Sequence, residues 1–139
     1  MIAVDTNILV RYITNDDQEQ AILAANLLDK YTGQEKSILI NNIVLCELIW
    51  VLDRWYKYKK AEIIKTLKLL LSSIEFEFEN HELAFLAVFK YETTDADFSD
   101  ILIGIINSNL ACLTTYSFDK KACRTKDFTL INAWKIRKT

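Results

Sequence analysis

Four carboxylates in this sequence are suited to hold a metal ion, and they come from four separated segments: Asp5, Glu47, Asp100 and Asp119. If folding gathers these side chains, their negative charges repel one another strongly. Mg²⁺ or Mn²⁺, which prefer oxygen ligands, would relieve that repulsion. A cation held in this way can generate a hydroxide nucleophile, neutralise a phosphodiester and stabilise its leaving oxygen. The set therefore favours phosphate chemistry over other reactions.

Glu47 is the most informative of the four because of its neighbours in the sequence. The residues one turn away from it, at positions 43, 44, 50 and 51, are all apolar, and the next polar position on its helix face is Arg54. We therefore expect apolar surroundings for this carboxylate, which are costly unless the group is paired, hydrogen-bonded or metal-bound. Pairing with a lysine is the structural alternative.

The aspartates also have a local interpretation as helix caps. Asp5 and Asp119 each lie just past a predicted strand, where aspartate is favoured as the first residue before a helix. Asp97 and Asp100 could form a capping arrangement. They are also three residues apart, so they can point the same way, and Asp95 adds further negative charge. This is more negative charge than one helix start requires.

The elements that must position these side chains are short apolar strands alternating with helices. Apolar runs predict strands at residues 1–4, 37–40, 74–78, 111–114 and 128–131. Helical spacing and capping residues predict helices after Asp5, from Asp16 or Asp17 to about Leu28, from Asn41 or Asn42 to about Tyr56, and at 61–71, 82–91, 98–109 and 119–123. This alternation predicts an α/β fold with a mostly parallel sheet, in which ligands gather at the carboxyl ends of strands.

Length and composition favour one soluble domain over residues 1–139, with 51% hydrophobic residues to form its core. No apolar run reaches the roughly 18 residues that span a bilayer, and the N-terminus lacks the basic segment of a signal peptide. Cys46, Cys112 and Cys123 show no CxxC spacing, which favours reduced thiols in a cytoplasm. The single histidine, His81, argues against zinc.

Basic residues form three groups, although the formal net charge of −2 is not typical of a nucleic-acid-binding protein. Each group could be a solvated helix face or part of a basic patch around the acidic site. Four aromatic residues at or near the first group could stack on bases, lie in an interface or belong to the core: Trp50, Trp55, Tyr56 and Tyr58. The three groups are Lys57, Lys59 and Lys60; Lys120, Lys121, Arg124 and Lys126; and Lys135, Arg137 and Lys138.

Four stretches, at residues 4–11, 46–52, 96–103 and 117–122, together resemble the PIN-domain family in the order of that family's motifs. Within the family the sequence resembles VapC-type toxin ribonucleases of bacterial and archaeal toxin–antitoxin pairs. The resemblance covers nearly the whole chain. It implies a three-layer α/β/α sandwich with a central, mostly parallel sheet of four to five strands.

The resemblance also implies roles for individual residues. Catalytic roles fall on Asp5, Glu47, Asp100 and Asp119, and the metal ligands would be Asp5, Asp97, Asp100 and Asp119. Residues that would hydrogen-bond these carboxylates or a water molecule are Thr6, Asn7 and either Ser117 or Thr115. The cofactor would be Mg²⁺ or Mn²⁺.

The function implied is that of an endoribonuclease toxin that hydrolyses phosphodiester bonds in structured RNA such as transfer or ribosomal RNA. The resemblance also implies a cytoplasmic homodimer and a cognate antitoxin protein whose tail blocks the site. One alternative is a catalytically inactive PIN-fold module that binds RNA or protein, although all four acidic positions are present. Another is a phosphotransfer enzyme with Asp5 as nucleophile, but Asn7 stands where such phosphatases need a second aspartate.

Overall fold

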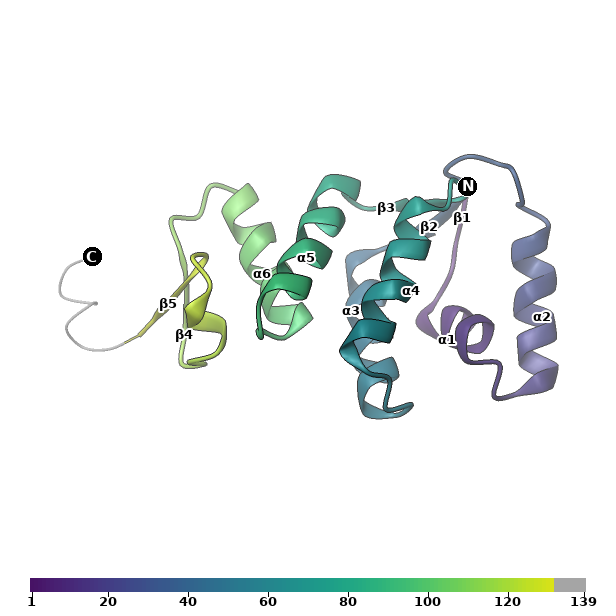
Figure 1. Cartoon of the computed structure of the whole chain (residues 1–139). Coiled ribbons are helices and arrows are strands. Elements are labelled where there is room, and N and C mark those ends of the chain that lie inside the picture. The colour runs from purple at the N-terminus through teal and green to yellow at the C-terminus, as the bar shows by residue number, and fades with distance from the viewer. Residues whose placement is uncertain (132–139) are drawn as a thin grey trace. The chain divides into compact units, whose positions relative to one another are not determined.

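The computed structural model (Figure 1) describes residues 1–131, which fall into two compact units. The N-terminal unit is Met1–His81, and the C-terminal unit begins at Glu82. No helix in the described part of the chain is both long enough and apolar enough to cross a bilayer. The elements of each unit explain how its own acidic residues are placed.

The N-terminal unit contains a parallel sheet of three short strands in the order β1-β2-β3. The strands are β1 (Ile2–Ala3), β2 (Ile38–Ile40) and β3 (Phe76–Phe78), and Ile38 pairs with Ile2 on one side and with Phe76 on the other. Ile38 and Ile40 are almost fully buried, as expected for a strand in the middle of a sheet. Asp5 follows β1 closely, which places it at the carboxyl end of an edge strand.

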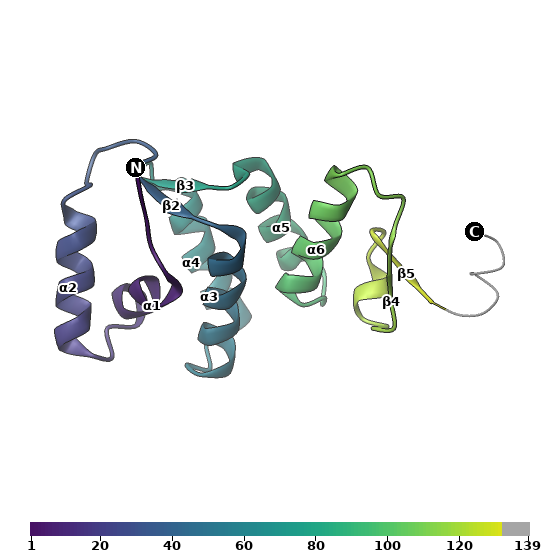
Figure 2. The ribbon, with the colours of Figure 1, turned by 180° about the vertical axis from the view of Figure 1, so that it is seen from behind.

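Four helices complete this unit: α1 (Thr6–Thr14), α2 (Gln18–Asp29), α3 (Asn42–Arg54) and α4 (Lys60–Ser72). Helix α1 contacts both α2 and α3, and Figures 1 and 2 show it between them. The core includes Leu9 of α1, Leu48 and Leu52 of α3 and Leu67 of α4, each with 1% or less of its surface exposed. Packing of α1 on α3 is what brings the segments of Asp5 and Glu47 together.

Three of these helices begin at the capping residues that the sequence predicts. Asp17 accepts a hydrogen bond from the backbone N–H of Gln20 at 3.1 Å, and Asn41 accepts one from that of Val44 at 2.9 Å. Asp5 caps α1 through the adjacent N–H of Thr6. Such caps satisfy backbone donors that have no partner inside the helix, and so they fix where each helix starts.

The C-terminal unit contains α5 (His81–Thr93) from its second residue onward, α6 (Phe98–Asn109), a 3-10 turn η1 (Ala122–Arg124) and two parallel strands. The strands are β4 (Thr115–Ser117) and β5 (Phe128–Leu130). Gly104 of α6 packs so closely on β5 that a Cβ atom there would lie 2.7 Å from the Phe128 ring. A largely buried ion pair joins Lys90 of α5 to Asp127 beside β5, with 2.6 Å between the charged atoms.

The predicted α/β class with parallel strands is confirmed, but the predicted single sheet of four to five strands is not what the structure has. Within residues 1–131 the strands form one sheet of three and one of two. The strand predicted at 111–114 was wrong, because β4 begins only at Thr115. The backbone N–H of Cys112 instead bonds back to Asn107 at the end of α6, and Leu113 is fully exposed. The short helix predicted at 119–123 is the single turn η1.

Candidate active site

Asp5 lies at the start of α1 with one carboxylate oxygen engaged. Its Oδ1 accepts a hydrogen bond from the backbone N–H of Thr6 at 2.7 Å. Its Oδ2 has no hydrogen-bond partner among residues 1–131, and the side chain is exposed. Asp5 therefore serves as the helix cap of the local interpretation and still presents a second oxygen that could bind a cation.

Thr6 connects Asp5 to Glu47. The Thr6 hydroxyl donates a hydrogen bond to Oε2 of Glu47 at 3.0 Å, between α1 and α3. Thr6 itself is only 6% exposed, so burial and two hydrogen bonds hold it in place. The two acidic residues are 42 positions apart in the sequence, yet the backbone nitrogen and the hydroxyl of one threonine contact both of them.

The expected apolar surroundings of Glu47 are wrong. Glu47 is exposed, and its apolar neighbours on the same face of α3, Ile43 and Trp50, are 68% and 54% exposed. The buried face of α3 instead runs through Leu45, Leu48 and other apolar residues. Exposure removes the desolvation cost that the sequence argument assigned to this carboxylate.

Asp5, Thr6, Asn7 and Glu47 line one pocket of about 640 Å³ in the N-terminal unit. Its other walls include Arg11, and Trp55 just past the end of α3. The pocket is large enough for a nucleotide-sized group. Two of the predicted acidic residues, Asp5 and Glu47, thus line the same pocket.

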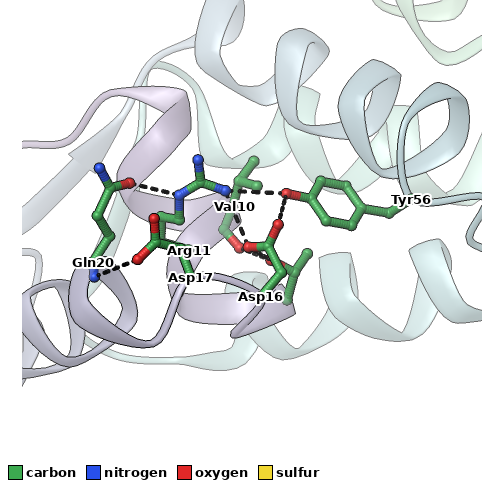
Figure 3. A network of polar contacts seen from close by, with 7 residues as sticks. Val10, Arg11, Asp16, Asp17, Gln20 and Tyr56 are labelled. Carbon is green, nitrogen blue, oxygen red and sulfur yellow. Dashed lines mark hydrogen bonds and ion pairs between the residues drawn. The ribbon is translucent and has the colours of Figure 1, made fainter.

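A polar network forms part of this pocket's wall (Figure 3). The Arg11 guanidinium donates to Gln20 Oε1 at 2.6 Å, to Asp16 Oδ1 at 3.0 Å and to the Tyr56 hydroxyl at 3.1 Å. The Tyr56 hydroxyl in turn donates to Asp16 Oδ2 at 2.6 Å. The hydrogen bond from Tyr56 is the main reason that the pKa of Asp16 lies below its ordinary value, although partial burial opposes it. The network ties the segment after α3 to α1 and α2.

The C-terminal unit holds the other three predicted acidic residues. Asp97 occupies the cap position of α6 without a capping hydrogen bond from its side chain, and Asp100 lies in the first turn of that helix. Burial raises the pKa of Asp100, and the negative charges of Asp119 and Asp97 raise it further, while Lys121 opposes the shift. Lys121 also pairs with Asp97 at 3.6 Å. Asp97 and Asp119 thus lie close enough to Asp100 for their charges to disfavour its ionised form.

Asp119 is held by the turn that it starts. Its Oδ1 accepts hydrogen bonds from the backbone N–H groups of Lys121 at 2.8 Å and Ala122 at 3.1 Å, as its interpretation as a cap predicts. The Ser117 hydroxyl accepts a hydrogen bond from the Asp119 N–H at 2.9 Å. The Thr115 hydroxyl contacts Asn107 instead. Of the two hydroxyls left open by the sequence, that of Ser117 is the one that contacts the segment of Asp119.

The donor set of both acidic groups fits a hard divalent cation, because every side chain in it offers carboxylate oxygen. The unpartnered Oδ2 of Asp5 and the mutual repulsion at Asp100 are the two features that a cation would relieve. Within either unit, no three acidic, histidine or cysteine side chains of the described residues lie close enough together to hold a metal ion by themselves.

The sequence interpretation missed Arg11 and Asp16 as part of the pocket wall, whereas it had named Trp55 and Tyr56 as residues that could stack on bases. Asp16 was predicted only to start a helix, and Arg11 only appeared inside a matching stretch. Trp50 and Trp55 are exposed, which excludes the core interpretation for both of them in this structure. The signal available in the sequence was the run of aromatic residues at 55–58 beside lysines. The third basic group, at residues 135–138, lies outside the described residues.

A family model for the PIN domain matches residues 2–125, which include every acidic residue of the predicted set. No curated protein matches the chain. The family match crosses both units and covers most of the sequence, so the chain belongs to the PIN-domain family.

Proposed function

We propose that this chain is a metal-dependent endoribonuclease, the toxin of a type II toxin–antitoxin pair like the VapC-type proteins that it resembles. The observation that carries the proposal is the family match over residues 2–125. The four acidic residues to which the resemblance assigns catalytic roles also support it. PIN domains are generally metal-dependent nucleases. The substrate would be a structured RNA such as transfer or ribosomal RNA.

The residues proposed to act on the phosphodiester are Asp5, Glu47, Asp100 and Asp119, with Asp97 as a further metal ligand. Asp5, Asp97, Asp100 and Asp119 would hold Mg²⁺ or Mn²⁺, which supplies charge neutralisation and activation of water when bound. Thr6 orients Asp5 and Glu47 through its two hydrogen bonds, and Ser117 orients the Asp119 segment. Asn7 lines the same pocket as Asp5 and is proposed to hydrogen-bond a carboxylate or water.

All five carboxylates are proposed to serve one PIN domain that comprises residues 1–139. The support is the continuous family match, which does not stop at the boundary between Met1–His81 and Glu82–Thr139. A homodimer, a cytoplasmic location and an antitoxin partner are proposed from the resemblance alone. A short neighbouring reading frame that encodes a DNA-binding protein would support the antitoxin partner.

The test is cleavage of total RNA in the presence of Mn²⁺ by the unmodified chain and by the D5N and D100N variants. Asparagine can still cap α1 in D5N, and D100N changes a residue in the first turn of α6 that is not its capping residue. Both changes therefore remove charge with little effect on the fold. We expect each variant to lose about a hundredfold or more of the activity, since a group that stabilises developing charge contributes on that scale. The matched control is D53N on the exposed surface of α3, which should cleave normally.

The second candidate is a PIN-fold module that binds RNA or protein without catalysis. All four predicted acidic positions are present, which counts against this alternative. Titration with Mn²⁺ separates the two functions, because an inactive module without a metal site would release no binding heat. Undiminished cleavage by D5N and D100N would also rule out the proposed mechanism.

A further inference from the structure

The pocket of the N-terminal unit carries side chains that the proposed hydrolysis does not use. Trp55 lines it with an indole that is 71% exposed, and Arg11 lines it with a guanidinium that is fixed in position. Both residues share the pocket with Asp5 and Glu47. The proposed nuclease activity does not explain what these two side chains bind.

Trp55 is held by its backbone while its ring stays in solvent. The residue caps the C-terminal end of α3, and its backbone N–H donates to the carbonyl of Val51 at 2.9 Å. An indole exposed to this extent gains little from the core, whereas a flat aromatic face beside a polar pocket is suited to stack on a nucleobase. Bases of any type offer such a face, so stacking requires no particular sequence.

Arg11 contributes directed donors. Its Nε and Nη1 are engaged by Gln20, Asp16 and Tyr56, which leaves its Nη2 without a hydrogen-bond partner among residues 1–131 (Figure 3). Because Asp16 offsets the charge of Arg11, the guanidinium acts here as a fixed pair of N–H donors more than as a free cation. Donors of this kind suit phosphate oxygens and base edges.

The segment after Trp55 adds positive charge. Lys57 and Lys59 follow within four residues and are both exposed. Lys57 has a backbone φ of 55°, so the chain turns sharply at this point. Exposed lysines attract a nucleic-acid backbone without selecting a sequence.

We propose that this pocket binds one unpaired nucleotide of the RNA substrate, with its base stacked on the Trp55 indole and an oxygen accepting a hydrogen bond from Arg11. The inference rests on the proposed nuclease function, because it places this nucleotide beside Asp5 and Glu47. In duplex RNA the base faces are covered by neighbouring base pairs, whereas loops and single strands expose them. The substrate class is therefore an unpaired segment, alone or within a structured RNA.

The test measures binding of a short unstructured RNA oligonucleotide and of a hairpin stem of similar length, by fluorescence anisotropy in excess EDTA. EDTA stops any metal-dependent cleavage, so the signal reports binding alone. The W55A variant loses the stacking of one base on the indole, so it should bind the single strand roughly 5- to 150-fold more weakly. W55F should keep most of the affinity, because phenylalanine also stacks.

Two further variants make the result specific. W50A is the matched control, because Trp50 is 54% exposed on α3 but does not line the pocket, and it should bind like the unmodified chain. R11K keeps the charge but lacks the planar guanidinium with its fixed N–H donors, so this variant should also bind the single strand more weakly. Equal loss in W55A and W50A, or equal loss for single strand and stem, would overturn the inference.

Cleavage assays separate this inference from the proposed function. If the unmodified chain cleaves RNA with Mn²⁺ while W55A shows the same KM, kcat and single-strand affinity, the subsite is refuted and the nuclease stands. If the unmodified chain does not cleave RNA but W55A still loses affinity for the single strand, the subsite stands and the nuclease is refuted. A raised KM with a smaller change in kcat supports both.

Discussion

Thr6 is the residue that couples two acidic segments, and its hydroxyl does so without contributing charge. Its backbone N–H binds Asp5 and its hydroxyl binds Glu47. Loss of a residue that orients the groups of a metal site typically costs about 10- to 100-fold in metal affinity or activity. The effects of a change at Thr6 on activity and on stability can be measured separately.

We expect T6V to lower RNA cleavage about tenfold or more, because valine keeps the volume of threonine but cannot hold Glu47, which is proposed to act on the phosphodiester. The loss of stability should stay below about 1 kcal/mol, since Glu47 is exposed and water can replace the hydroxyl. Cleavage of total RNA with Mn²⁺ and thermal unfolding in EDTA give the two quantities. T6S retains the hydroxyl and is the control; equal cleavage by T6V and T6S would contradict the role assigned to Thr6.

Asp16 should give the chain a stability that depends on pH. Its pKa in the folded chain lies below the ordinary value of 3.8, chiefly because of the hydrogen bond from Tyr56. A carboxylate with a lowered folded pKa stabilises the fold above its unfolded pKa, and this stabilisation is lost as the pH falls through the folded pKa. At neutral pH the Asp16 carboxylate therefore makes its full contribution to the stability of the fold.

The D16N variant should consequently unfold at a lower temperature than the unmodified chain near neutral pH. This difference should shrink as the pH is lowered below 3.8. The Y56F variant removes the main hydrogen bond but keeps the carboxylate, and should show the same trend to a smaller extent. Thermal melts at several pH values measure the difference in unfolding temperature between each variant and the unmodified chain. A difference that does not change with pH would show that the network around Asp16 is not its cause.

At the scale of elements, the helices and four of the five strands could be predicted from the sequence. Each helix over residues 1–131 lies within a few residues of its prediction, because caps such as Asp17 and Asn41 and the apolar periodicity act locally. Four of the strands, β1, β2, β3 and β5, lie inside their predicted ranges, although each has only two or three residues. At 111–114 an apolar run was taken for a strand, whereas hydrogen bonds that close the end of α6 use part of that segment.

At the candidate site, features visible in the local sequence could be predicted, whereas contacts between distant segments could not. The carboxylates could be predicted because their type and their places next to elements are visible in the sequence. The contact of Arg11 with Tyr56, 45 positions apart, depends on how α1 packs on α3 and leaves no local pattern. The environment of Glu47 was predicted wrongly because apolar neighbours along a helix do not show which face is buried.

Gly104 gives a prediction at the scale of packed elements. An alanine there would place its Cβ 2.7 Å from Phe128 and 2.9 Å from the Cβ of Asp127, so α6 and β5 would have to separate. Overpacking of this kind costs about 1–3 kcal/mol. Alanine favours a helix over glycine by only about 1 kcal/mol.

The G104A variant should therefore unfold more easily in urea, even though its helix propensity improves. The control is S108A, at an exposed position on the same helix, which should change the free energy of unfolding by no more than about 0.5 kcal/mol. A G104A variant as stable as the unmodified chain would show that β5 yields to the new methyl group without cost.

At the scale of the whole molecule, the acidic residues are divided between the two units. Asp5 and Glu47 belong to Met1–His81, while Asp97, Asp100 and Asp119 belong to the part that begins at Glu82. The sequence could not reveal this division, because the motifs follow one another without a linker rich in glycine or proline. The family match nevertheless treats residues 2–125 as one domain. A single chain should therefore supply a complete set of carboxylates.

Mixing the D5N and D100N variants tests that expectation. If one chain supplies the whole set, every chain in the mixture lacks one carboxylate, and the mixture should cleave RNA no better than either variant alone. If two chains of a dimer instead shared the set, mixed dimers would regain an intact site, and about a quarter of the activity would return. Cleavage should be compared after joint refolding, so that subunits can exchange; recovery of activity would show that the carboxylates act across two chains.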